Sequence, residues 1–377
     1  PLVAGAMSGG RLTVLVVYDA TPWIVHLFRR AAGIETADPR LAEEYVADGV
    51  VALPLEEQVR RILAASVVLA LAVAFAPVVL GVAVVAGLVL SAATLLSLAP
   101  WRTAARLAAV TLASSVGAVV LNLQWASTWT WEGWVGPPPI GDPGRGFLAV
   151  ASFEIGVTDF AALSLALYLP VLAAVALARA WRLTWAIRSG FLVLAFGALA
   201  VLADRGSLPF AAPEAGVLLV PVAVGVAVSA GAALAAFDLD VRGGSFGWRQ
   251  PLGILASIAV IVGVVPGIAA IRDGAWETPT TPLARLIDAS FPSAVEAGGD
   301  YNILFVGDAR LLPVPATEYR DGLAWEIVDA GALVTRYGWA PPPFVAAVLV
   351  VTALDQIAAS STLRAGRLLA PLGIRYV

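Results

Sequence analysis

Long apolar stretches with almost no ionisable side chains dominate the chain, and most of them end at arginines. They cover residues 62–99, 103–125, 161–180, 185–203, 215–236 and 252–271. A helix of about 20 apolar residues matches the hydrocarbon core of a bilayer, which is roughly 30 Å thick. A soluble helix of that length would carry a polar face. The pattern therefore predicts a polytopic membrane protein.

Two of the apolar stretches need interpretation. Residues 62–99 would form a single helix about 57 Å long, which exceeds one span, so we predict two spans that meet near Ala76 and Pro77. Residues 11–28 contain Asp19 and His26, and we count them as a further span. Asp19 is either a functional intramembrane carboxylate or the N-cap of an interfacial helix. The expected total is about seven or eight spans.

The arginines predict how the spans are oriented, because short cytoplasmic loops collect positive charge. Arginine clusters lie at 29–30, 60–61, 102–106, 179–188 and 242–249, which alternation of the spans places on one side. A tryptophan-rich loop, 126–160, and everything after residue 272 then lie on the outer face. We expect a multi-pass protein of the plasma membrane with an extracytoplasmic C-terminal domain.

From about residue 273 the pattern changes to short strands. Tyr301–Asp308 and Leu323–Val328 have strand character, residues 344–360 have a helical period, and the closing Ile374–Val377 resembles the first half of a strand. A strand, a crossover helix and another strand predict a small α/β domain. The alternative of a span at 343–354 fails, because twelve apolar residues are too few.

These boundaries give an all-α polytopic transmembrane bundle followed by a truncated extracytoplasmic α/β domain. The predicted parts are an N-terminal transmembrane segment at 1–30, a cytoplasmic connection at 31–60, the bundle at 61–272 and the α/β domain at 273–377. We expect the chain to be part of a longer one, cut upstream and downstream.

Composition supports a lipid environment and narrows the chemistry. Hydrophobic residues make up 60% of the chain and charged residues 13%, against about 25% charged in soluble domains. The net charge of −4 argues against a nucleic-acid partner. With no cysteine and only His26 as histidine, the sequence predicts neither a metal site nor a cofactor.

The predicted outer loop contains the candidate chemistry. A carboxylate there can act as a general base towards a sugar hydroxyl, and an arginine can hold the phosphates of a lipid-linked donor. Glu154 and Asp159 are the candidate catalytic residues, with Glu154 in an apolar run, Phe147–Val157, that we expect to be a partly embedded helix. The candidate substrate-binding residues are Arg145, Glu132, Asp142, Trp129 and Trp131.

Each of these residues also has a plainer interpretation. Loop charges at an interface are solvated without further purpose, and Asp159 is a good N-cap for a helix that starts near Phe160. Asn122 and Gln124, at the end of a span, favour interhelical hydrogen bonds over ligand contacts.

Several segments resemble the membrane and C-terminal parts of large actinobacterial cell-envelope glycosyltransferase-type proteins. They are Phe246–Gln250, Ile303–Leu312, Leu354–Ile357 through Ser361–Arg364, and Leu369–Val377. In some such proteins a family 2 glycosyltransferase domain precedes the membrane region, which resembles the C-type glycosyltransferase superfamily. C-type enzymes usually carry their key acidic residue in the first outer loop, upstream of this chain, so no catalytic residue is transferred.

The resemblance implies a membrane-embedded part of an envelope glycosyltransferase that meets a polyprenyl-phosphate-linked sugar donor and an envelope glycan acceptor on the outer face. Two alternatives stay open. One is a non-enzymatic transporter or flippase-like bundle, although no internal repeat is evident. The other is a structural membrane module whose outer domain binds a glycan or a partner.

Overall fold

The computed structural model forms two compact units, each described here by itself. The helical unit comprises Pro1–Ser127 and Gly144–Thr278, and the α/β unit comprises Thr128–Pro143 and Pro279–Val377. The structure describes residues 2–8, 11–35, 49–50, 53–97, 100–126, 145–155, 160–209, 212–238, 247–272, 289–292, 296, 298–308, 317–320, 323–329, 344–362 and 364–377.

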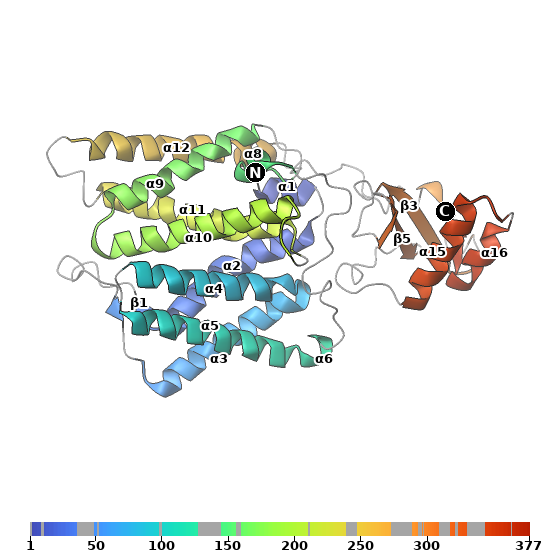
Figure 1. The fold of residues 1–377 in the computed structure, drawn as a ribbon, viewed down its shortest axis with the longest axis horizontal. Helices are drawn as coiled ribbons and strands as arrows, with labels where there is room; N and C mark the ends of the chain where they lie inside the picture. The colour runs from blue at the N-terminus through green and yellow to red at the C-terminus, as the bar shows by residue number, and fades with distance from the viewer. Residues whose placement is uncertain are drawn as a thin grey trace. The chain divides into compact units, whose positions relative to one another are not determined.

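Long helices that lie side by side make up the helical unit (Figure 1). They are α2 (Leu12–Ala31), α3 (Leu55–Phe75), α4 (Val78–Leu96), α5 (Trp101–Leu121), α10 (Ala180–Asp204), α11 (Ala215–Ala236) and α12 (Arg249–Ile271). Within the described part of the chain, six of these, all except α2, are long and apolar enough to cross a membrane. The predicted break at Ala76 and Pro77 is confirmed, because α3 ends at Phe75 and α4 begins at Val78.

Shorter segments complete this unit. They are α1 (Leu2–Ser8), β1 (Ile34–Glu35), β2 (Gly49–Val50), α6 (Leu123–Ala126), α8 (Phe147–Ala151), η1 (Ala161–Leu167) and α9 (Tyr168–Leu177). The stretch expected to span at 161–180 is a 3₁₀ segment followed by α9, and it is shorter than the six long apolar helices. Asp19 lies inside α2 with an exposed side chain, so the interpretation of Asp19 as a helix N-cap is wrong.

Small residues form the contacts between the long helices. A Cβ added to Gly225 of α11 would lie 2.8 Å from the main-chain oxygen of Ser189 in α10. Close by, the hydroxyls of Ser189 and Ser229 are 2.7 Å apart. Such close approach of backbones is typical of membrane helices, where small residues and interhelical hydrogen bonds replace hydrophobic burial. The interhelical hydrogen bond predicted for Asn122 is confirmed, since its Nδ2 donates to the carbonyl of Ala70 in α3 at 3.1 Å.

Contacts near the helix ends show which ends of the helices lie together. Arg61 near the start of α3 donates to the carbonyl of Arg30 at the end of α2. Arg249 at the start of α12 donates to the carbonyl of Leu177 at the end of α9. We call this the arginine-rich end; its arginines are Arg29, Arg30, Arg60, Arg61, Arg102, Arg179, Arg182 and Arg249.

The opposite end of the bundle carries both signs of charge, and we call it the mixed-charge end. Arg11, just before α2, forms an ion pair there with Glu214, just before α11. Asp204, the last residue of α10, lies at the same end and binds main-chain groups of Arg145 and Gly146.

A four-stranded sheet of order β4-β5-β3-β6 forms the centre of the α/β unit. Its strands are β3 (Asn302–Asp308), β4 (Thr317–Arg320), β5 (Leu323–Asp329) and β6 (Ile374–Tyr376). β3 pairs parallel with β6 and antiparallel with β5. The expected strand, crossover helix and strand are confirmed as β3, α15 (Phe344–Ala358) and β6, whereas β4 was not predicted.

The two faces of this sheet bury different clusters. Trp325 and Leu304 pack with Val350 and Leu354 of α15 and with Leu369 of α16 (Ala365–Leu369). The other face buries Tyr301, Ile303 and Val328 against Phe291, Phe305 and Tyr376. Alternation along β5 explains the division, because neighbouring residues of a strand point to opposite faces.

Candidate functional site

The mixed-charge end is organised around the carboxylate of Asp204. Its Oδ1 accepts the main-chain N–H of Arg145 at 3.0 Å, and its Oδ2 accepts that of Gly146 at 3.1 Å. These groups immediately precede α8, whose first N–H groups have no partner within the helix. Gly146 has a φ of 83°, a conformation that glycine adopts without steric penalty. Asp204 therefore fixes the start of α8 to the end of α10.

Arg145 also links the two ends of the segment that contains α8. Its Nη1 donates to the main-chain oxygen of Glu154 at 3.0 Å, so the predicted binding arginine contacts the backbone of the predicted catalytic residue. The expectation that Phe147–Val157 forms one partly embedded helix is wrong, because α8 ends at Ala151. Phe153 adopts a φ of 60°, outside the right-handed helical region, and this turns the chain just before Glu154.

Two buried side chains anchor Glu154 from either side. The ring of Phe153 is buried and stacks on Tyr168, with ring centroids 6.0 Å apart. Ile155 is also buried, and its side chain lies 3.3 Å from the position that a Cβ on Gly216 would occupy. Val14 of α2 approaches the same point at 3.3 Å. The half-buried Glu154 is thus held beside the first turns of α2 and α11.

Arg11 and Glu214 flank the same first turns. Because they form an ion pair just before α2 and α11, the junction that receives Ile155 is bordered by a guanidinium and a carboxylate. Glu154, Glu214, Arg11 and Arg145 thus lie near one apolar surface at this end. The guanidinium group of arginine binds phosphate oxygens through paired hydrogen bonds. A carboxylate can accept the proton of a hydroxyl as a general base.

The predicted site residues fall into two groups. Arg145 and Glu154 are brought together, whereas Asp159, Glu132, Asp142, Trp129 and Trp131 lie outside the described residues. Sequence reasoning missed Arg11, Asp204 and Glu214. Each stands at the end of an apolar helix, where an isolated charge is ordinarily interpreted as solvated, and only their shared position at one bundle end distinguishes them.

A second polar feature lies towards the arginine-rich end. The sequence pattern assigned Arg188 to a cytoplasmic cluster, but the residue lies inside α10 and is only 1% exposed. Its Nε donates to the hydroxyl of Thr94 in α4 at 3.0 Å, and its guanidinium stands 5.1 Å from the ring centroid of Trp185. Ionisable residues within spans are rare and commonly functional.

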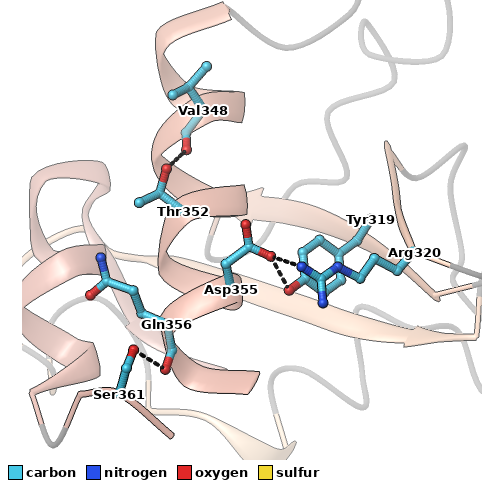
Figure 2. Close-up of polar contacts among 7 residues, drawn as sticks. All are labelled: Tyr319, Arg320, Val348, Thr352, Asp355, Gln356 and Ser361. Carbon is cyan, nitrogen blue, oxygen red and sulfur yellow. Dashed lines mark hydrogen bonds and ion pairs between the residues drawn. The ribbon is translucent and has the colours of Figure 1, made fainter. Parts of the chain in front are cut away.

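Polar contacts in the α/β unit have a structural character. Figure 2 shows Asp355 of α15 accepting hydrogen bonds from Tyr319 at 2.7 Å and Arg320 at 2.6 Å, which ties β4 to the helix. The hydrogen bond to Asp355 raises the pKa of Tyr319. On the other face of the sheet, burial raises the pKa of Glu326 to about 7.

Within the described residues, no group of three or more His, Asp or Glu side chains is arranged to hold a metal ion. Comparisons with protein-family models, curated proteins and solved structures found no match to the chain.

Proposed function

We propose that the chain is the membrane-embedded portion of a cell-envelope glycosyltransferase-like protein. It lies in the plasma membrane with the arginine-rich end towards the cytoplasm, and the mixed-charge end and the α/β unit lie outside. The lipid-linked sugar is a polyprenyl-phosphate derivative, and an envelope glycan accepts the sugar. The observation that carries the proposal is the contact between the Arg145 guanidinium and the backbone of Glu154, which brings these two predicted site residues together at the mixed-charge end.

The asymmetry of charge supports the orientation. Eight arginines lie at one end of the bundle, whereas the other end has Arg11, Arg145, Arg205 and Arg272 together with Glu214 and Asp204. Positively charged residues in short loops are retained in the cytoplasm during insertion, while acidic residues have little influence.

The proposed chemistry assigns roles to Glu154, Arg11 and Asp204 at this end. Glu154 accepts the proton of the acceptor hydroxyl while that oxygen attacks the anomeric carbon of the donor. The bond from this carbon to the phosphate oxygen breaks, and polyprenyl phosphate leaves with the bonding pair. Arg11 stabilises the negative charge on the departing phosphate. Asp204 and the main chain of Arg145 position the segment.

Transfer of labelled sugar from polyprenyl-phosphate donors by the full chain in liposomes tests this assignment. Glu154→Gln removes the base, and general-base catalysis typically contributes about 10²- to 10⁴-fold to the rate. We expect a loss of that order, with Glu56→Gln, at the start of α3, as the unchanged control. Transfer by Glu154→Gln at the rate of the unmodified chain would contradict the role of Glu154.

A transporter or flippase-like function is the second candidate, and buried Arg188 favours it. Arg188 lies inside a span, next to the hydrogen-bonded Ser189 and Ser229. Transporters bind substrates through such polar groups within the membrane. Movement of fluorescent polyprenyl phosphate across the same liposomes measures this activity. If movement persists in Glu154→Gln and is abolished in Arg188→Gln, transport replaces sugar transfer as the function.

A further inference from the structure

The indole of Trp185 is flanked by two guanidinium groups from different helices. Cζ of Arg29, in the last turn of α2, lies 5.7 Å from the ring centroid, and Cζ of Arg188 in α10 lies 5.1 Å from it. Arg29 and Trp185 are half-buried, whereas Arg188 is buried. Segments far apart in the sequence therefore build one cationic cluster, which we call the Trp185 cluster.

The buried member of this cluster is held in place. Packing and the bond from Arg188 Nε to Thr94 Oγ1 hold its guanidinium over the ring of Trp185. A positive charge in surroundings of low dielectric constant acts more strongly on a nearby anion than one in water does. Arg188 thus fixes the orientation of Trp185 and adds positive potential, while half-buried Arg29 is the group that a ligand can reach.

The positions of the cluster residues along their helices match the level of lipid headgroups. At 1.5 Å per residue, Trp185 lies roughly 8 Å and Arg188 roughly 12 Å from the start of α10. Arg29 is in the last turn of α2. Tryptophan favours this interfacial level, and arginine side chains extend from it towards phosphates.

The start of α3, which carries two arginines and two glutamates, lies close to the end of α2. Arg61 joins α3 to α2 through the carbonyl of Arg30. Glu57 is shared between two arginines, Arg60 and Arg61, so one carboxylate faces two guanidinium groups. Basic pockets between membrane helices are known sites for anionic headgroups.

We propose that the Trp185 cluster binds the phosphate of a membrane lipid at the arginine-rich end. Arg29 binds the phosphate oxygens directly, Trp185 packs beside the lipid below the headgroup, and Arg188 positions the indole. An anionic phospholipid and polyprenyl phosphate share this chemistry. The site lies at the opposite end of the bundle from Glu154 and does not depend on sugar transfer.

Lipid binding to the purified full chain tests the proposal. In detergent micelles the chain is titrated separately with phosphatidylglycerol, polyprenyl phosphate and phosphatidylcholine, and bound lipid is counted by native mass spectrometry. We expect saturable binding of at least one phosphate lipid with net negative charge, above that of phosphatidylcholine. Arg29→Gln should weaken this binding by roughly tenfold or more, because it removes charge-assisted hydrogen bonds.

Arg60→Gln is the matched control, since Arg60 lies at the same end with a side chain 77% exposed. A specific site predicts that Arg60→Gln changes the affinity by less than about twofold. Trp185→Leu provides a second variant that retains all charges, and it should also weaken binding. Preference for one of the two anionic lipids identifies the source of the phosphate. Equal losses in Arg29→Gln and Arg60→Gln, or equal binding of phosphatidylcholine, would overturn the proposal.

Discussion

The two units of this chain contain core clusters of different composition. The α/β unit buries large residues such as Trp325, Leu304 and Ile303 between its sheet and the segments that cover it. In the helical unit, the cluster where α9, α10, α11 and α12 meet is mostly alanine. Larger side chains such as Phe28, Leu69 and Phe196 are buried elsewhere in this unit, while Leu71 and Phe75 of α3 are more than half exposed. In water the exposed apolar side chains would be unfavourable, whereas in a bilayer they contact lipid.

The contrast shows that one chain is stabilised in two ways. Hydrophobic burial drives folding of the α/β unit, since transfer of large apolar side chains from water is favourable. Close backbone approach and internal hydrogen bonds stabilise the helical unit, because lipid tails are as apolar as the side chains. Substitutions of similar size should therefore have different consequences in the two units.

The largest expected effect is in the α/β unit. Trp325 is 1% exposed and occupies the core between β5 and α15, so Trp325→Ala should destabilise this unit by about 3–5 kcal/mol. Hydrogen exchange of the full chain should show lost protection in β3 and β5, with α10 and α11 unchanged. The control Leu323→Ala alters an exposed side chain of the same strand. Loss of protection in both units would remove the distinction between them.

Acidity should change the stability of the α/β unit through Glu326. Burial raises its pKa from 4.5 to about 7, so between these values the folded unit retains a proton that the unfolded chain has released. Stability therefore falls as pH rises through this window, and the loss persists at higher pH. Glu326→Gln stays neutral and should become the more stable protein above about pH 7, by at most about 3 kcal/mol.

Hydrogen exchange of β5 at several pH values measures this difference between Glu326→Gln and the unmodified chain. The two proteins should match near about pH 4, where both side chains are neutral. A constant difference at every pH would show that the carboxylate is not responsible.

Close helix packing predicts a smaller effect within the bundle. A Cβ at Gly225 would lie 2.8 Å from the Ser189 main-chain oxygen, whereas a Cβ at Gly231, on the same helix, meets nothing within 4 Å. Gly225→Ala should destabilise the bundle by about 1–3 kcal/mol, and Gly231→Ala should leave it unchanged or slightly more stable. Thermal unfolding in detergent compares them. Equal melting temperatures would contradict the close contact of α10 and α11.

The smallest effect is expected at Asp355. Its bonds to Tyr319 and Arg320 are on the surface, where such interactions contribute about 0–1 kcal/mol. Asp355→Asn should lower the protection of β4 slightly and leave β3 unchanged in hydrogen exchange. It should also lower the pKa of Tyr319, since the bond to the carboxylate is what raises it. A large loss of stability would mean that Asp355 supports more than the edge strand.

Sequence periodicity predicted the long helices, the break at Pro77, and the strand, helix and strand of the α/β unit. These depend on local properties, namely apolar length and proline geometry. The site was predicted less well. Asp204 binds main-chain groups 58 and 59 residues away, and no local pattern reveals such a contact. Arg188 was assigned to a loop cluster because only packing against Thr94 distinguishes it from an interfacial arginine.

The central claim is that the bundle crosses the membrane with its arginine-rich end in the cytoplasm. The chain contains no cysteine, so a single introduced thiol reports the side of its own position. Arg205→Cys, just after α10, and Arg60→Cys, near the start of α3, place exposed thiols at opposite ends. A membrane-impermeant maleimide added to intact cells should label Arg205→Cys and should label Arg60→Cys only after lysis. Labelling of Arg60→Cys in intact cells, with Arg205→Cys protected, would contradict the orientation.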